Sequence, residues 1–307
     1  MNMSDSTKVY TADQDDERLD RFLTRMEPTL SRAHVQKVIA EGQALVSGRV
    51  RKANYKLQAG EEVTFHLPEA KPVEILPEDI PLDILYEDEI FLVVNKPAGM
   101  IVHPTHRAAR NTLVHAVAGY FERRGEAAGI HPLYRLDRDT TGIVILAKSA
   151  RIQHVMTQHH GQIYREYLAL VQGHLDRPSG RIDMPIARDI TRANHWQVRA
   201  DGRRALTEYE NIASWPSYSL LKIHLLTGRT HQIRVHFAAL GHPLLGDTAY
   251  DGSCDTIPRQ ALHAWRVHFF HPDTGKEIRI EAPIPEDMCR LIGSDTVSRE
   301  TFKEEIK

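Results

Sequence analysis

The segment His131–Gly142 reads His-Pro-Leu-Tyr-Arg-Leu-Asp-Arg-Asp-Thr-Thr-Gly, and the rest of the chain is best interpreted outward from it. A purely apolar run, Ile143–Ala147, follows directly and predicts a buried strand. Such a strand would hold the preceding charged loop on a rigid support, as catalytic loops require. A solvated turn with surface ion pairs has the same charge pattern and stays an alternative. The charged residues of the loop are Arg135, Asp137, Arg138 and Asp139.

Asp137 in this loop resembles the catalytic aspartate of the RNA pseudouridine synthases. Its surroundings resemble the RluA type, whose RluC- and RluD-like members modify large-subunit ribosomal RNA. Further motifs of the family follow in the same order, so that the resemblance runs from about Pro81 to Ile292. Tyr134 is a departure, because many relatives carry histidine there, and it leaves the substrate subgroup open. The matching segments are residues 84–89, 94–100, 164–173, 227–236, 246–247, 259–264 and 282–285.

The resemblance implies a fold, a reaction and three active-site residues. Asp137 would be the catalytic carboxylate, Tyr167 the active-site tyrosine and Arg234 the partner of the aspartate. The reaction cleaves the N-glycosidic bond of uridine, rotates the free uracil and rejoins it through carbon, with no cofactor. Attack on C1′, attack on C6 and a glycal path each give a carboxylate a role and stay open. The uridine must leave its stack, so base flipping is implied.

The expected role of Arg234 follows from the chemistry of a buried carboxylate. Burial favours the protonated acid, and a nearby cation opposes this. We therefore predict that Arg234 keeps Asp137 ionised and aimed through a paired hydrogen bond. Arg234 would lie beside the apolar stripe of a helix that carries Ile233, Phe237 and Leu240, near an end that attracts anions. Tyr167 offers a ring for uracil to stack on, although a lone strand tyrosine is more often a core residue.

Composition bounds the class of protein. A length of 307 residues favours two domains, and 41% hydrophobic and 26% charged residues are ordinary for a globular chain. No apolar run approaches the roughly 20 residues of a membrane span, and the acidic N-terminus has no signal core. Cys254 and Cys289 are expected to be ordinary thiols in a reducing compartment. We therefore expect a cytoplasmic protein with no membrane partner.

The N-terminal region is basic within a chain of net charge −2. From Arg18 to Lys56 there are nine basic residues against three acidic ones, which indicates phosphate binding. Residues 18–63 resemble the small RNA-binding module of the αL type that was first known from a small-subunit ribosomal protein. A basic surface without a partner is the alternative. The candidate RNA-binding residues here are Arg32, Lys37, Arg49, Arg51 and Lys52.

Local patterns predict the elements of this module. Ser31 is expected to cap a helix that buries Val35, Val38 and Ile39 and ends at Gly42. Strands are expected at residues 45–50 and 60–65.

The domain prediction divides the chain into five segments. These are a flexible leader over residues 1–16, an RNA-binding domain over 17–68, a linker over 69–81, a catalytic domain over 82–292 and a polar tail over 293–307. The linker prediction rests on four prolines, which stiffen the chain and exclude helix. We expect an α+β fold, in which the catalytic domain has the large mixed, mostly antiparallel sheet of the pseudouridine synthase fold. The prolines are Pro68, Pro72, Pro77 and Pro81.

Several cations of the catalytic domain are further candidates for contact with RNA. Five arginines and Trp196 lie between residues 188 and 204, and guanidinium both binds phosphate and stacks on bases. A solvated hairpin with a turn at Asp201-Gly202 is the alternative. Lys96, at the end of a predicted strand over residues 90–95, would meet phosphate or lie in solvent. The candidate RNA-binding residues of this domain are Arg135, Arg138, Arg188, Arg192 and Arg229.

The function predicted from these features is RNA pseudouridine synthase, most consistent with large-subunit (23S) ribosomal RNA. Transfer RNA is an alternative substrate, and a non-catalytic ribosome-assembly factor is an alternative class. A glycosidase with Asp137 and Asp139 as its carboxylate pair is a third possibility. The 18 histidines lack the spacing of metal ligands, so no metal is expected. No obligate protein partner is implied.

Overall fold

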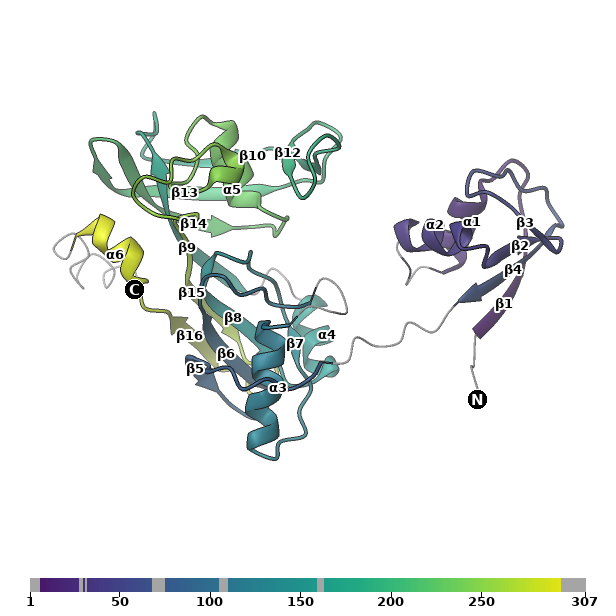
Figure 1. Ribbon diagram of the computed structural model, residues 1–307, viewed down its shortest axis with the longest axis horizontal. Helices are drawn as coiled ribbons and strands as arrows, with labels where there is room; N and C mark the ends of the chain where they lie inside the picture. The colour runs from purple at the N-terminus through teal and green to yellow at the C-terminus, as the bar shows by residue number, and fades with distance from the viewer. Residues whose placement is uncertain are drawn as a thin grey trace. The chain divides into compact units, whose positions relative to one another are not determined.

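The computed structural model describes residues 6–27, 30, 32–67, 75–104, 110–158 and 163–293. Its contacts divide the chain into two compact units, Met1–Val73 and Glu74–Lys307 (Figure 1). The division falls within residues 69–81, the predicted linker. None of the described helices is both long enough and apolar enough to cross a membrane.

The first unit packs two helices, α1 (Leu19–Met26) and α2 (Arg32–Ala40), against a four-stranded antiparallel sheet. The sheet order is β1 (Ser6–Thr11), β4 (Glu62–Leu67), β2 (Ala44–Val46) and β3 (Arg49–Val50). Val35, Val38 and Ile39 are buried on one face of α2, as predicted. Gly42 follows with a positive φ of 76°, while the predicted cap Ser31 lies outside the described residues. These elements share one core, which includes Leu19, Phe22, Leu23, Val46, Leu57, Val63 and Phe65.

The prediction of a flexible leader is wrong for Ser6–Thr11, which form β1. This strand pairs with β4 along its whole length, from Ser6 opposite Leu67 to Thr11 opposite Glu62. β1 is an edge strand, so it needs hydrogen bonds on one side only. Tyr10 and, just after the strand, Ala12 are its contacts with the core. Two apolar contacts give too weak a periodicity to reveal a strand in a polar segment.

The second unit is built on a ten-stranded sheet. Eight strands follow one another in the order β10-β13-β14-β9-β15-β8-β6-β5, while β16 pairs with β15 and β7 with β8. Of these described pairings, β15 with β8 is parallel and the others are antiparallel. The predicted α+β fold with a mixed, mostly antiparallel sheet is therefore confirmed. The strands are β5 (Ile84–Glu87), β6 (Phe91–Lys96), β7 (His131–Pro132), β8 (Thr141–Ala147), β9 (Tyr164–Gln172), β10 (Ser179–Asp183), β13 (Leu206–Trp215), β14 (Tyr218–Leu225), β15 (Leu262–Phe270) and β16 (Glu277–Glu281).

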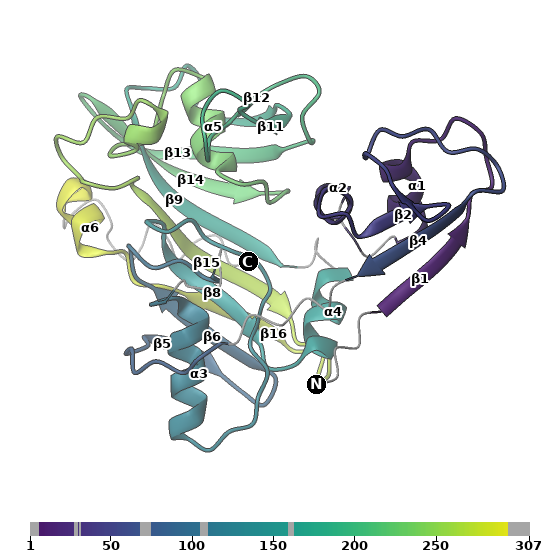
Figure 2. The same cartoon turned by 45° about the vertical axis from the view of Figure 1, so that its right-hand side comes forward.

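Helices cover both faces of this sheet (Figures 1 and 2). Tyr167 and alternate residues of β9 face the core beneath α3 (Leu113–Arg123) and α5 (Gln232–Ala239). Leu168 and Leu170 face the opposite core, beneath α6 (Glu286–Ile292), and α4 (Ala150–Gln158) covers the same side near β8. The predicted alternation of β9 is confirmed. Leu240, predicted on the buried face of α5, is instead exposed just past its end.

Part of the predicted linker belongs to the second unit. Glu78 donates its N–H to the carbonyl of His115 at 3.1 Å, and Asp79 pairs with Arg123. A Cβ on Gly119 would come 2.1 Å from the Glu78 carbonyl oxygen, so glycine alone allows this approach. The prolines of residues 75–81 therefore stiffen a segment packed on α3 rather than a spacer.

The arginine-rich segment forms a separate two-stranded sheet of β11 (Ile186–Arg188) and β12 (Trp196–Val198). The turn predicted at Asp201-Gly202 is present, but it does not join these strands, because residues 189–195 do. It leads instead from β12 to Arg203, which bridges back to Ile186. β12 packs against α5, which carries Arg234.

Candidate active site

The loop that carries Asp137 enters β8 where β8 meets β15. Gly142 has a φ of +106°, and a Cβ there would lie 2.2 Å from the Ala264 carbonyl oxygen. Only glycine permits both this backbone conformation and this close approach. The Thr-Thr-Gly turn therefore fixes the end of the loop against the centre of the sheet.

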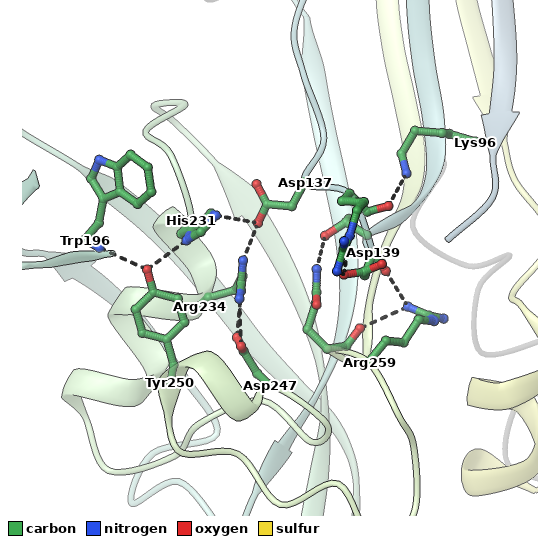
Figure 3. Close-up of polar contacts among 12 residues, drawn as sticks. Lys96, Asp137, Asp139, Trp196, His231, Arg234, Asp247, Tyr250 and Arg259 are labelled. Carbon is green, nitrogen blue, oxygen red and sulfur yellow. Dashed lines mark hydrogen bonds and ion pairs between the residues drawn. The ribbon is translucent and has the colours of Figure 1, made fainter. Parts of the chain in front are cut away.

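One carboxylate oxygen of Asp137 is held by the protein (Figure 3). Oδ2 accepts a hydrogen bond from Arg234 Nη1 at 3.0 Å and lies 3.7 Å from His231 Nε2. Oδ1 accepts no hydrogen bond from any residue in the described part of the chain. The carboxylate is thus anchored through one oxygen, in a residue that lines the adjoining cavity.

Arg234 lies between two carboxylates. Its Nε and Nη2 donate to Asp247 at 2.7 and 2.8 Å, while only Nη1 reaches Asp137. The predicted paired hydrogen bond to Asp137 is therefore wrong, because the paired bond goes to Asp247. Asp247 is 1% exposed, and a carboxylate removed from water needs this full compensation. Burial alone would lower the pKa of Arg234, but the two aspartates raise it overall, so the guanidinium stays charged.

His231 supports the same carboxylate from the N-terminus of α5. Its backbone is left-handed, with φ 56°, and its Nδ1 lies 2.8 Å from the hydroxyl of Tyr250, in the 3₁₀ helix Thr248–Tyr250. That hydroxyl also accepts the backbone N–H of Trp196 at 3.2 Å. Burial lowers the pKa of His231, which favours the neutral ring. The other ring nitrogen, Nε2, lies on the Asp137 side, 3.7 Å from Oδ2.

Lys96 occupies neither of the predicted environments. Its side chain is 1% exposed, and its Nζ donates to the carbonyls of Pro97, Met100 and Arg138 at 2.8 to 2.9 Å. Burial lowers its pKa to about 7, although Asp139 and Asp137 act in the opposite direction. Lys96 therefore ties the backbone of the Asp137 loop to the end of β6.

Arg259 holds the same loop from its other side. Nη1 donates to the carbonyl of Asp139 at 3.2 Å, and Nε and Nη2 form a paired bond with Asp287 of α6. Gln260 adds a hydrogen bond to the Thr140 hydroxyl at 3.2 Å. The loop is thus held by Lys96 of β6 and, through Arg259, by α6.

A cavity of about 670 Å³ opens beside Asp137, within the size range of small-molecule sites. Tyr167, 4% exposed, lines its wall, and burial raises the pKa of its hydroxyl. The cavity therefore combines an anchored carboxylate, an aromatic ring and several cations. Of the predicted RNA-binding arginines, those that line it are Arg135, Arg138 and Arg229.

Two more predicted RNA-binding residues of the second unit do not line this cavity. Arg188 and Arg192 are exposed at the loop between β11 and β12. In the first unit, Arg32 pairs with the buried Asp20 at 2.9 Å, so part of its charge serves that unit's own structure. Lys37, Arg49 and Lys52 are exposed. The guanidinium of Arg51 lies over the Tyr55 ring.

Asp139 does not form a carboxylate pair with Asp137. Its side chain pairs with Arg138 at 3.2 Å and does not line the cavity. A glycosidase needs two carboxylates that flank one bond, which this site does not provide. Within the described ranges, no group of three His, Cys, Asp or Glu side chains is arranged to hold a metal ion.

Sequence reasoning had assigned no role to Asp247, His231 or Tyr250. The first two lie in segments that carry the family resemblance, so a signal for them was available. Tyr250 had none, because its role depends on a contact with His231, 19 residues earlier.

Comparison with known proteins agrees with this geometry. Residues 90–239 match the RNA pseudouridylate synthase family model, and residues 17–63 match the S4 domain model. An uncharacterized RNA pseudouridine synthase of Bacillus subtilis is 40% identical over 95% of this chain and 98% of its own. The ribosomal large subunit pseudouridine synthase D of Escherichia coli K12 is 35% identical over 98% and 97%. The solved human RNA pseudouridylate synthase domain containing 1 is 26% identical, with a TM-score of 0.54 over 67% of this chain and 84% of that one.

Fold and site together define an RNA-modifying enzyme with a separate RNA-binding domain. More narrowly, the chain belongs to the RluA family of RNA pseudouridine synthases that carry an N-terminal S4 domain. It is an isomerase, and RNA is its partner.

Proposed function

We propose that this enzyme isomerises uridine in large-subunit (23S) ribosomal RNA and that Asp137 is the carboxylate that acts on the nucleotide. The observation that carries the chemistry is the anchoring of Asp137 through Oδ2 alone, at the wall of the cavity, with no described residue bonded to Oδ1. The substrate choice rests on the Escherichia coli relative, whose name refers to the large ribosomal subunit.

In the proposed mechanism, the target uridine turns out of its stack and enters the cavity, where Tyr167 supports the uracil ring. Asp137 starts the reaction, and the bond between C1′ and N1 breaks with its electron pair passing to the uracil. The uracil rotates, and C5 bonds to C1′. C5 then loses its proton to solvent while N1 takes up a proton, so that the product is an isomer of the substrate. Arg234, itself fixed by Asp247, keeps the carboxylate aimed throughout.

Cations around the cavity would position the RNA without reading its sequence. Arg135, Arg138 and Arg229 lie along the cavity wall, where phosphates beside the flipped nucleotide would pass. The S4 domain adds Lys37, Arg49 and Lys52 as exposed phosphate contacts. The target uridine is then selected by the shape of the RNA and by contacts to the nucleotides that flank it.

Pseudouridine mapping of total RNA tests reaction and substrate together. Cells that lack the gene are complemented with the wild type, Asp137→Asn or the control Asp273→Asn, an exposed carboxylate paired with Arg151. We expect sites in 23S RNA to disappear and to return with the wild type and the control, but not with Asp137→Asn. Sites lost only from transfer RNA would overturn the substrate, and restoration by Asp137→Asn would overturn the role of this residue.

A further inference from the structure

Arg165 is a cation of the cavity that the proposed mechanism does not yet use. It lies on β9 two residues before Tyr167, so both side chains emerge on the same face of the sheet and line the cavity. Its Nε is buried without a hydrogen-bond partner among the described residues. None of the described carboxylates forms an ion pair with it. A buried donor on a charged group left unpaired by the protein is rare and points to an external partner.

The guanidinium of Arg165 is nevertheless held in place. Its carbon lies 5.2 Å from the centre of the Tyr134 ring, and the Tyr134 hydroxyl is fixed by the Ile143 carbonyl at 3.2 Å. Gly228 lies beside the guanidinium: a Cβ added to Gly228 would be 3.6 Å from Nη1 and 3.9 Å from Nη2 of Arg165. The guanidinium therefore packs between an aromatic ring and a residue without a side chain. A cation fixed in this way has lost most of its mobility before any ligand arrives.

The position of this cation relative to Asp137 suggests what it binds. Arg165, Tyr167 and Asp137 line the same cavity. Burial raises the pKa of the Tyr167 hydroxyl, and Arg165 opposes this shift while Asp137 reinforces it. A nucleotide supported by Tyr167 and attacked by Asp137 would thus have Arg165 nearby. Its anionic oxygens are those of its phosphate and, once the C1′–N1 bond breaks, O2 and O4 of the uracil.

We propose that Arg165 donates hydrogen bonds to an anionic oxygen of the target nucleotide. The planar guanidinium, with parallel N–H groups, suits either a phosphate or the delocalised charge of a departing uracil. This inference rests on the proposed function. It adds a substrate-binding residue from the strand that also carries Tyr167.

The test compares the full-length wild type with Arg165→Gln, Arg165→Lys and a control, Arg279→Gln, an exposed arginine of β16 paired with Glu277. The substrate is ribosomal RNA from cells that lack the gene, with tritium at C5 of uridine. Two quantities are measured: the RNA Kd over a range of salt concentrations, and the single-turnover rate of tritium release at saturating enzyme. Thermal unfolding of each variant checks its fold.

A uracil contact predicts a saturated rate about tenfold or more lower in Arg165→Gln, with Kd within about twofold of the wild type. A phosphate contact predicts an unchanged saturated rate, a higher Kd and a salt slope reduced by about 1. In both cases we expect Arg165→Lys to lose less than Arg165→Gln, because the positive charge is kept. If Arg165→Gln does not fold, Arg165→Lys is compared with the wild type instead. Arg165→Gln with wild-type rate, Kd and slope would overturn the proposal. Absence of tritium release by the wild type would instead reject the proposed function.

Discussion

At the scale of single residues, the site is organised by one guanidinium shared between two carboxylates. Arg234 gives its paired bond to the buried Asp247 and a single bond to Asp137. Asp247 therefore has both carboxylate oxygens bonded to Arg234, whereas Asp137, which is more exposed, has one. This division assigns different consequences to the loss of each.

Asp247→Asn should destabilise the fold as well as the site. It leaves the 7% exposed Arg234 with one charged partner instead of two, and breaking such a buried pair costs about 3 kcal/mol. Urea denaturation of this variant is expected to show that loss in the free energy of unfolding. The control Asp255→Asn, at an exposed carboxylate bonded to Ser253, should change it by less than about 0.5 kcal/mol. A loss below about 1 kcal/mol for Asp247→Asn would mean that Arg234 finds compensation elsewhere.

At the scale of elements, the junction of β8 and β15 carries the Asp137 loop. Thr141 and Gly142 of β8 lie opposite His263 and Ala264 of β15. The Thr141 hydroxyl is 2.9 Å from Nδ1 of His263, whose side chain is fully buried. The start of β8, where the loop ends, is therefore in contact with a buried histidine.

We expect His263 to make the free energy of unfolding depend on pH. Burial lowers the pKa of His263 from 6.5 to about 4, so the unfolded chain binds its proton more readily. Stability from this group is fully present above pH 6.5 and is lost as the pH falls toward 4, by about 3 kcal/mol. We expect His263→Asn to reduce the change in the free energy of unfolding between pH 7 and pH 4.5. Equal pH dependence in the two proteins would contradict this.

Local patterns in the sequence predict many of the strands and helices, although not β1, and they do not predict which elements meet. The alternation around Tyr167 and the apolar run after Gly142 identify β9 and β8 because side-chain periodicity is a local property. The parallel pairing of His263 with Thr141 joins residues 122 apart, and no local pattern contains it. Lys96 was mistaken for an accessible cation for the same reason: the three carbonyls that bury it come from a turn and a distant loop.

At the scale of the whole molecule, two units divide the work on RNA. The catalytic unit supplies the cavity and its arginines, and the S4 unit supplies a small, separately packed domain with its own core. We therefore expect that substitutions in the S4 unit can weaken non-specific phosphate binding without changing the chemical step, which takes place in the catalytic unit.

The double variant Arg49→Gln/Lys52→Gln should weaken RNA binding without slowing the chemical step. Both side chains are exposed, and removing one cation that touches phosphate lowers the salt slope by about 1. We expect a higher Kd, a shallower slope and an unchanged saturated rate in filter-binding and single-turnover assays. Lys276→Gln, an exposed cation between β15 and β16, is the control. An unchanged slope in the double variant would show that these two side chains do not touch phosphate.

The pairing of Arg259 with Asp287 extends the active site to the end of the described chain. One guanidinium nitrogen of Arg259 donates to the Asp139 carbonyl, and the other two donate to Asp287 of α6. A protein truncated just before α6 would keep Asp137, Tyr167 and Arg234, yet it would lose the anchor of the arginine that steadies the loop. An intact set of motifs is therefore no guarantee of a working enzyme, since α6 acts as a brace for residues encoded about 150 positions earlier.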